Sequence, residues 1–424
     1  MLTTRGGAMH KKRTFLFLQG VASPFFTELE KVMIKTDHQA LKINFCGGDL
    51  FSGRFFKSAL KHINYKDTLE KLPAFYQNIF DQYSVTDIIL FGDTRPVHRP
   101  AVELAKKHSL NIHVFEEGYF RPHWITLEKG GVNAHSSLSK DPQWFLDYAA
   151  QNQSNGESQT PRKSAGGGLS TRAWYDIRYQ LSKALLKPLF PYYKTHRPDS
   201  ALREYWGFIK RMPSLYFYYD RKADAQIKAL LDGGNPYFLL PLQLDADSQI
   251  RLHSPIKNLT TFIQTSIQSF AENAAENACL VIKIHPLDPW FIDFPEIIQQ
   301  SALENGISNK RLLYLESGNL NTLLKQAKGT VLVNSTVGNS ALAYGCPVIA
   351  LGSAIYDIPG LTFQGSLDDF WTQATSPDKT LFAAFRKCII ETTQINGSFY
   401  NIKGIRMAIK GAIPLLEGSF KNHV

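Results

Sequence analysis

The sequence predicts an α/β protein in which two Rossmann-like domains face each other across a cleft. In both halves of the chain, short apolar runs alternate with helical stretches, a pattern that indicates βαβ units and parallel sheets. A polar segment rich in glycine and serine, at residues 151–172, separates the two halves. A chain of 424 residues is also too long for one ordinary hydrophobic core.

The first half is predicted to form an N-terminal Rossmann-like domain at residues 1–150. Its expected strands are the apolar runs at 14–20, 41–45, 87–92 and 111–118. Helical patterns lie between them, for example at residues 25–36 and 99–108. The segment 151–172 that follows has the composition of a flexible linker.

Residues 173–234 are rich in aromatic and basic side chains and are predicted to form a helical connector. This connector has two interpretations: a bridging helical hairpin with a solvated basic face, or a surface that contacts anionic lipid headgroups.

A C-terminal Rossmann-like domain is then expected at residues 235–400, with a helical tail at 401–424. Its predicted strands lie at 237–243, 280–286, 311–317, 329–336 and 347–352, and two predicted helices at 259–278 and 320–328. Two doubly wound halves joined by a linker form the arrangement called GT-B, which many proteins other than transferases also adopt.

The composition limits the partners and the compartment. A formal net charge of +10 predicts an anionic partner, which is a nucleotide, a nucleic acid or an acidic lipid surface. The sequence has no zinc-finger, RRM or bZIP pattern, so we expect no nucleic acid. The 4 cysteines lack CxxC spacing, which favours a reducing cytosol. No apolar run reaches the ~18 residues of a membrane span and no signal peptide is visible, so we expect a cytoplasmic protein.

Polar side chains follow several strands of the second half, at the edge where open α/β sheets bind ligands. Lys283 and His285 end one predicted strand and have groups that stabilise a phosphate. Asn334, Ser335 and Thr336 follow another, where a helix is expected to open and its free N–H groups bind anions. Each set alone is also consistent with a core histidine or an N-cap. Together they favour a nucleotide donor in the C-terminal domain.

The strand at 237–243 is followed by a run of polar side chains, which includes Gln243, Asp245, Asp247 and Arg251. Asp245 and Asp247 spell D-x-D, a motif that holds a divalent metal in many glycosyltransferases of a different fold. Capping or loop hydrogen bonds are a second interpretation. The third is a carboxylate in the cleft that attacks the anomeric carbon of a sugar or stabilises its positive charge.

In the first half, Glu116 and Glu117 end the strand at 111–118. Because adjacent strand residues point to opposite faces, we expect only one of them to face the cleft. That glutamate has the chemistry of a general base, although an N-cap or a salt bridge would also explain it. Other strand ends add polar groups that would line an acceptor site able to hold an anion: Gln19, Asp93, Arg95 and His98.

These stretches together resemble the capsule polysaccharide biosynthesis/export family, the bacterial β-Kdo transferases that build the lipid-linked Kdo primer of group 2-type capsules. Matching segments include FGDTRPVHR, EEGYFRPHWITLE, PLQLDADSQIR and VNSTVGNSAL, and the resemblance extends over residues 15–362. The single-module length resembles the member that adds the first Kdo.

The resemblance implies a retaining transfer of Kdo from CMP-Kdo to a (lyso)phosphatidylglycerol acceptor at the inner membrane, to which the protein would be peripheral. It makes Asp247 the nucleophile, with Gln243 in the same motif, His285 near the CMP phosphate and Glu116 the base. The NST segment maps onto residues 334–336.

The residue chemistry agrees with this implication. Lys283, Arg251 and His285 suit the anionic donor, and Arg95 suits an acidic lipid. CMP has one phosphate, so no metal cofactor is expected. Other capsule biosynthesis and export proteins are further expected partners. Two alternatives stay open: a non-catalytic export adaptor that binds the lipid-linked glycan, and a metal-dependent transferase that uses the D-x-D pair.

Overall fold

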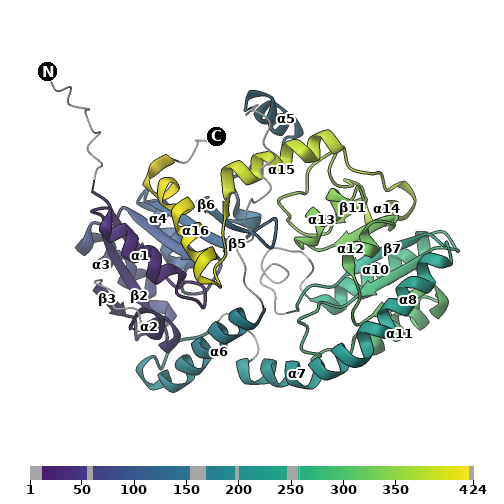
Figure 1. Ribbon diagram of the computed structural model, residues 1–424, viewed down its shortest axis with the longest axis horizontal. Coiled ribbons are helices and arrows are strands. Elements are labelled where there is room, and N and C mark those ends of the chain that lie inside the picture. The colour runs from purple at the N-terminus through teal and green to yellow at the C-terminus, as the bar shows by residue number, and fades with distance from the viewer. Residues whose placement is uncertain are drawn as a thin grey trace. The chain divides into compact units, whose positions relative to one another are not determined.

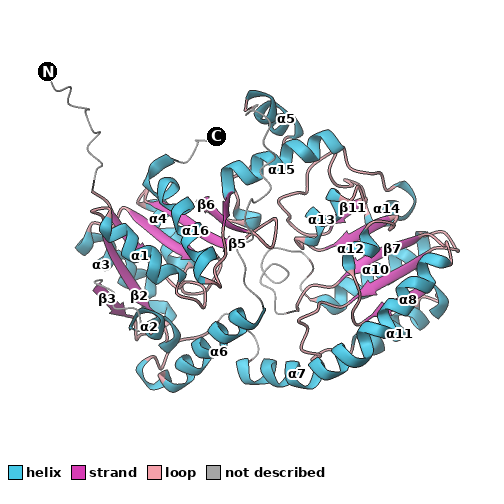
Figure 2. Ribbon diagram, viewed as in Figure 1, coloured by secondary structure: helices cyan, strands magenta, loops and turns pink. Residues whose placement is uncertain are grey.

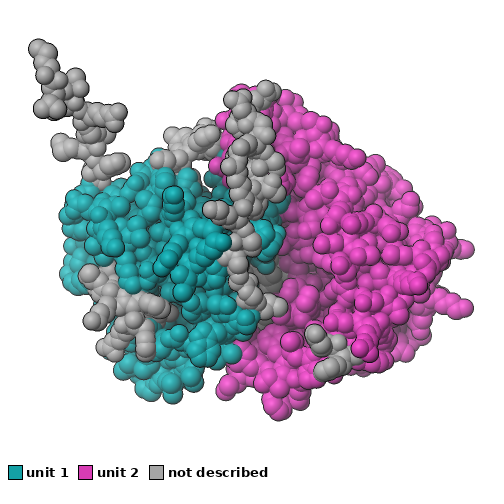
Figure 3. Space-filling view, in the orientation of Figure 1, with its two compact units in different colours: residues 1–137, 159–196, 392–424 teal, residues 138–158, 197–391 magenta. Residues whose placement is uncertain are grey.

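The computed structural model describes residues 12–54, 61–152, 169–195, 200–245, 256 and 258–419. The chain forms two compact units, shown in different colours in Figure 3. The first consists of residues 1–137, 159–196 and 392–424, and the second of residues 138–158 and 197–391. Each unit has its own sheet with helices on it, so the predicted α/β class with two Rossmann-like domains is confirmed. That these domains face each other across a cleft stays a prediction.

The first unit is built on a sheet with the strand order β12-β6-β5-β4-β1-β2-β3. Its strands β2, β3, β5 and β6 are labelled in Figure 1. Its strands are β1 (Thr14–Phe17), β2 (Gln39–Asn44), β3 (Lys61–Asn64), β4 (Asp87–Phe91), β5 (Asn111–Glu117), β6 (Trp124–Lys129) and β12 (Gln394–Asn396). Strands β1 to β5 pair in parallel, whereas β6 and β12 are antiparallel additions at one edge. The four predicted strands of this half are confirmed, while β3, β6 and β12 were not predicted.

Both faces of this sheet are covered. Successive residues of β1 point to opposite faces, and all of them after Thr14 are apolar and buried. Phe15 and Phe17 belong to one core cluster, and Leu16 belongs to the other. The helices of the unit are α1 (Phe25–Lys35), α2 (Gly47–Arg54), α3 (Leu72–Tyr83), α4 (Arg99–Lys107), α6 (Leu169–Leu185) and α16 (Ile402–Pro414).

The second unit has a wholly parallel sheet with the order β11-β10-β7-β8-β9. Its strands are β7 (Tyr237–Pro241), β8 (Cys279–Lys283), β9 (Leu312–Leu315), β10 (Gly329–Leu332) and β11 (Val348–Ala350). All five predicted strands are therefore confirmed. Their continuous apolar sequences are those of strands buried on both faces.

Helices and loops complete the second unit (Figure 2). They are α5 (Pro142–Gln151), α7 (Ala201–Ser214), α8 (Asp220–Asp232), α10 (Leu259–Asn273), α11 (Phe294–Glu304), α12 (Leu320–Leu324), α13 (Val337–Ala343), α14 (Leu367–Gln373) and α15 (Lys379–Thr393), whose last two residues fall in the first unit. A π-helical turn, Leu215–Tyr219, joins α7 to α8. None of the helices in the described ranges has the length and apolar character needed to cross a membrane.

The two units do not follow the predicted domain bounds. The predicted connector at 173–234 is divided, because α6 lies in the first unit and α7 and α8 lie in the second. The predicted tail at 401–424 is not separate either. Its helix α16 contributes Ile405 and Ile409 to the core cluster that contains Phe15, so the end of the described chain completes the N-terminal unit.

Candidate functional site

In the second unit, the carboxyl ends of β7 and β10 are joined by a pair of side-chain amides. The Gln243 side-chain N–H donates to Asn334 Oδ1 at 3.2 Å, and the Asn334 backbone N–H donates to Gln243 Oε1 at 3.2 Å. Both side chains are buried. The structure thus brings together two predicted site residues that lie 91 positions apart, because β7 and β10 are neighbours in the sheet.

The end of β8 and the loop that follows it supply an ammonium group, from Lys283, and an imidazole, from His285. His285 Nδ1 accepts a hydrogen bond from the Leu287 backbone N–H at 3.0 Å, so the neutral ring carries its proton on Nε2. Burial, reinforced by the Arg211 charge and opposed by Asp220, lowers the pKa of Lys283 to about 8. At neutral pH the Lys283 side chain is therefore still mostly charged, and both groups are donors that suit an anion.

A buried arginine that the sequence did not single out holds this loop in place. Arg211, on α7, donates to the backbone oxygens of His285 at 3.2 Å, Pro286 at 3.4 Å and Glu316 at 3.1 Å, and also to that of Asp288. Only 2% of the Arg211 side chain is exposed. Its planar guanidinium group can donate five hydrogen bonds in fixed directions, so α7 fixes the path of the backbone beside His285.

The predicted NST segment lies between β10 and α13. Ser335 Oγ accepts from the Val337 backbone N–H at 3.2 Å, a local capping contact, and the Tyr356 hydroxyl donates to the Ser335 carbonyl at 2.6 Å. Thr336 precedes α13 and makes no side-chain capping bond. A Cβ atom at Gly338 would lie 2.2 Å from the Tyr356 ring, so this close contact requires glycine.

The acids after β7 are only partly described. Asp245 Oδ1 accepts from the Leu259 backbone N–H at the start of α10, at 3.2 Å, which is the capping contact that the sequence offered as one alternative. Asp247 and Arg251 lie outside the described residues. Within the part of the chain that the structure describes, no three His, Cys, Asp or Glu side chains group as metal ligands would.

In the first unit, Glu116 and Glu117 at the end of β5 have separate partners. Glu116 Oε1 accepts from the Glu117 backbone N–H at 2.9 Å. Glu117 Oε1 instead accepts from the Tyr400 hydroxyl at 2.9 Å and forms an ion pair with Arg172 at 3.4 Å. Glu117 therefore has the salt-bridge role that the sequence left open, whereas Glu116 forms no ion pair within the described ranges.

The pKa of Glu116 suits a base at neutral pH. Burial raises this pKa to about 7, the Glu117 carboxylate adds to the rise, and the charges of Arg95 and Arg121 oppose it. A catalytic base works best when its pKa is near the operating pH. Glu116 Oε2 lies against Gly92, where a Cβ atom would be 3.3 Å away.

The end of β1 carries a buried polar cluster around Gln19. The Gln19 side-chain nitrogen lies 3.1 Å from an Asp49 carboxylate oxygen and 3.1 Å from each of the Tyr179 and Tyr193 hydroxyls. Arg95 donates to Gln19 Oε1 at 3.3 Å and to the Gly20 carbonyl oxygen. The predicted pair of Gln19 and Arg95 is thus brought together, and Tyr179 and Tyr193 are partners that the sequence did not indicate.

Asp93 and His98 are held by internal hydrogen bonds. His98 Nδ1 donates to the Gly92 carbonyl at 2.6 Å, and burial lowers the pKa of His98 to about 3, so the ring is neutral. Asp93 is buried and accepts from His135 Nδ1 at 2.8 Å. The predicted contact of these two residues with a substrate stays a prediction.

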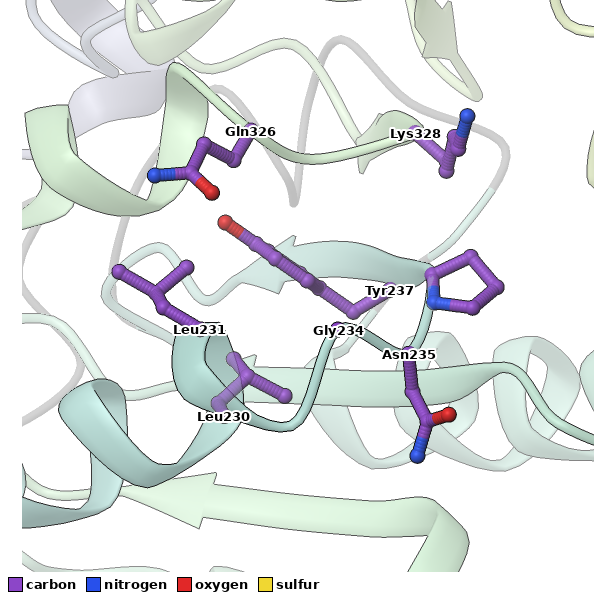
Figure 4. Close-up of a pocket in the computed structure, with 8 residues that line it drawn as sticks. Leu230, Leu231, Gly234, Asn235, Tyr237, Gln326 and Lys328 are labelled. Atoms are coloured by element: carbon purple, nitrogen blue, oxygen red, sulfur yellow. The ribbon is translucent and has the colours of Figure 1, made fainter.

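A pocket of about 410 Å³ lies at the other end of β7, away from Gln243 (Figure 4). Its lining includes Leu230, Tyr237, Gln326 and Lys328. The Tyr237 hydroxyl, which points into this region in Figure 4, donates to the Leu323 carbonyl at 2.7 Å. Ligands of open α/β sheets bind at the carboxyl ends of the strands, so we do not assign the candidate site to this pocket.

The two sheets with polar carboxyl edges define a class, the two-domain α/β proteins with a Rossmann-like unit in each half. Comparison with known proteins gives the family. The sequence profile described as "Capsule polysaccharide biosynthesis protein" matches residues 86–400. The chain belongs to this family, and the resemblance seen in its motifs is confirmed.

Two relatives are similar over nearly the whole chain. The capsule polysaccharide modification protein LipB of Neisseria meningitidis serogroup B is 34% identical over 399 residues, which are 93% of each chain. The capsule polysaccharide export protein KpsS of Escherichia coli is 33% identical over 395 residues, 92% of this chain and 97% of the relative. Among solved structures, the KpsC β Kdo 2,7 transferase of Thermosulfurimonas dismutans is 14% identical, with a TM-score of 0.43 and coverage of 96% and 100%.

Proposed function

We propose that this protein is a retaining β-Kdo glycosyltransferase. It transfers Kdo from CMP-Kdo to a (lyso)phosphatidylglycerol acceptor and so starts the poly-Kdo linker of capsular polysaccharide. The observation that carries the proposal is the carboxyl edge of the second unit's sheet, where Lys283, His285 and the Gln243–Asn334 amide pair lie at or just beyond the ends of three of its strands. Membership of a capsule polysaccharide biosynthesis family supports the same process.

The donor has two anionic groups, the carboxylate next to its anomeric carbon and the phosphate of CMP. The Lys283 ammonium and the His285 Nε2–H suit these groups, because donors already in place stabilise charge that develops as a bond to phosphate breaks. Gln243 and Asn334 have amide groups that suit the polar parts of the nucleotide. None of this binding requires a metal, because CMP has one phosphate.

The proposed reaction has two displacements at one carbon. Asp247 attacks the anomeric carbon of Kdo as CMP leaves, which forms a glycosyl ester. Glu116 then takes the proton of an acceptor hydroxyl, and the oxygen attacks the same carbon and releases the Asp247 carboxylate. Two inversions at one centre retain the configuration. A Glu116 pKa of about 7 leaves much of this carboxylate ready to accept a proton at neutral pH.

The proposal is tested by incubating the purified protein with CMP-Kdo and a fluorescent phosphatidylglycerol, with EDTA present. We expect a lipid product heavier by one Kdo unit and release of CMP in equal amount. Product that forms only when EDTA is left out would instead favour the metal-dependent transferase that uses Asp245 and Asp247.

The E. coli relative is named as an export protein, and this name favours a second candidate function. In this alternative the chain is a non-catalytic adaptor that binds the lipid-linked glycan on its way to a transporter. The adaptor would bind the glycan but release no CMP from CMP-Kdo in the same assay, so one measurement separates the two candidates.

A further inference from the structure

Helix α6 of the first unit exposes an apolar stripe. At about 100° per residue, four of its large apolar side chains fall within an arc of about 80°. They are Trp174, Ile177, Leu181 and Leu185, and all of them are exposed. Leu185 is 69% exposed, whereas a surface helix of a globular protein normally turns such residues to the core. A contiguous exposed apolar stripe marks an interaction site.

The opposite face of α6 is fixed in the unit by close contacts with α2. A Cβ atom at Gly47 would lie 2.3 Å from the Ser182 carbonyl oxygen, and one at Gly48 would lie 2.6 Å from the Tyr179 ring. The Tyr179 hydroxyl donates to Asp49 at 2.7 Å. The helix therefore cannot rotate its apolar stripe inward without breaking this packing, and its inner face contacts Gln19 of the candidate site.

The charges around the stripe have one sign. Arg178 lies beside the stripe on α6, and Lys187 and Lys194 follow the helix, whereas Arg172, Lys183 and Asp176 fall on its opposite side at about 100° per residue. The Arg178 guanidinium lies 5.7 Å from the centre of the Trp174 ring. A second copy of the chain packed on this face would bring like charges together, which is unfavourable. An apolar stripe with basic flanks instead fits an anionic lipid surface.

Helix α7 of the second unit also exposes an apolar stripe beside a basic side chain. Leu202, Trp206 and Ile209 are exposed and fall within an arc of about 60°. The Lys210 ammonium lies 5.2 Å from the centre of the Trp206 ring. The inner face of α7 carries the buried Arg211 that holds the backbone beside His285. Each unit thus has a helix with an apolar outer stripe and an inner face that contacts a candidate site residue.

We propose that α6 and α7 each dock their own unit on the surface of an anionic lipid bilayer. The apolar stripes enter the boundary between headgroups and acyl chains, and the basic side chains contact lipid phosphates. The inference deepens the proposed function and rests on it for the lipid acceptor. Docking through α6 and α7 would bring the lipid acceptor close to candidate site residues. The inner faces of these helices hold those residues in position.

The test is flotation of the full chain with lipid vesicles in the absence of CMP-Kdo. Vesicles of phosphatidylcholine alone are compared with vesicles that also contain phosphatidylglycerol or phosphatidylserine. We expect both anionic mixtures to bind the protein at least about tenfold more tightly than phosphatidylcholine, because each basic residue near the surface adds several-fold. Binding to phosphatidylglycerol but not to phosphatidylserine would show headgroup recognition and overturn the docking surface.

Two variants test whether the apolar and basic side chains at α6 bind the vesicles. Leu181→Glu with Leu185→Glu on α6 should lower vesicle binding about tenfold or more, since charge replaces inserted apolar area. The matched control is Leu303→Glu on α11, which is 76% exposed but isolated, and should bind as the wild type does. Lys187→Glu with Lys194→Glu should also lower binding to anionic vesicles.

Three further results would overturn the inference: no binding to either anionic mixture, unchanged binding by the Leu181/Leu185 variant, or a lipid-free dimer that this variant converts to a monomer. The last result would identify the face as an interface between two copies. A protein that floats with vesicles but transfers no Kdo would keep the docking surface and lose the proposed transferase.

Discussion

Glu116 shows how surroundings set the chemistry of a single residue. Its neighbour Glu117 has an arginine and a tyrosine as partners, whereas burial raises the pKa of Glu116 to about 7. The sequence predicted that only one glutamate of the pair would serve as base. It could not decide between them by spacing alone, because the deciding partners, Arg172 and Tyr400, come from segments distant in the chain.

The pH dependence of transfer tests the role of Glu116. A base must be deprotonated, so the rate should be low below the Glu116 pKa of about 7 and reach a plateau above it. Glu116→Gln should lower kcat by about 10²–10⁴-fold, and Glu117→Gln, as the matched control, should lower it far less. An unchanged pH profile in the Glu116 variant would contradict the assignment.

Lys283 illustrates a conflict between donor binding and stability. Its pKa in the folded protein is about 8, against an ordinary 10.5, because burial disfavours the charge. Between these values the unfolded chain holds a proton that the folded protein has lost. The free energy of unfolding therefore rises with pH over that range and is lowest below it.

Lys283→Met should remove this rise of stability with pH and increase the free energy of unfolding at pH 7 by about 1–3 kcal/mol. The same variant should weaken CMP binding by about tenfold or more, because a charge-assisted hydrogen bond is lost. Denaturant unfolding at several pH values and calorimetric titration with CMP measure the two effects. A variant that is less stable but binds CMP normally would count against the assignment.

At the scale of elements, the sequence predicted the strands that are continuous apolar runs. Strands β1, β4 and β7 to β11 have this pattern, since both faces of their sheets are covered, whereas β2 and β5, which were also predicted, interrupt it with Lys42 and His113. The missed strands β3, β6 and β12 lie at or next to a sheet edge, and β12 has only 3 residues. Their pairing depends on a partner strand, which a local pattern does not reveal.

The connector helices carry structure that composition could not predict. Their basic residues indicated a charged surface, yet Arg211 turns inward and holds the loop after β8.

Arg211→Met should lower the free energy of unfolding by about 3 kcal/mol, because Glu316 and several carbonyl oxygens lose their donor. The exposed Arg221 on α8 offers a control, since Arg221→Met should change stability by no more than about 0.5 kcal/mol. Equal effects of the two substitutions in urea unfolding would refute the proposed role of Arg211.

At the scale of the whole molecule, neither unit is formed from one continuous stretch of the chain. The chain passes to the second unit at residue 138 and returns to the first at residue 159. From residue 197 it forms most of the second unit, and at residue 392 it returns to add β12 and α16 to the first. Apolar periodicity predicts a helix at the C-terminus but not the unit that it joins, so the sequence suggested a separate tail. The contacts of Ile405 with the aromatic core of the first unit are long-range.

Two isoleucines on α16 test this arrangement. Ile405 is buried in the first unit's core, whereas Ile402, one turn earlier, is 64% exposed. Ile405→Glu should destabilise the protein by about 3–5 kcal/mol because it buries an unpaired charge. Ile402→Glu should cost less than about 1 kcal/mol. Similar thermal unfolding of the two variants would mean that α16 does not complete the first unit.

The account as a whole depends on a carboxylate nucleophile in the second half of the chain. The most direct test compares wild type, Asp247→Ala and Asp245→Ala in transfer from CMP-Kdo to phosphatidylglycerol, with the anomeric configuration of the product determined. The account predicts a β-linked product from the wild type, none from a folded Asp247→Ala, and residual transfer by Asp245→Ala, because Asp245 accepts a hydrogen bond from the first residue of α10. Full transfer by Asp247→Ala, or a product of inverted configuration, would contradict it.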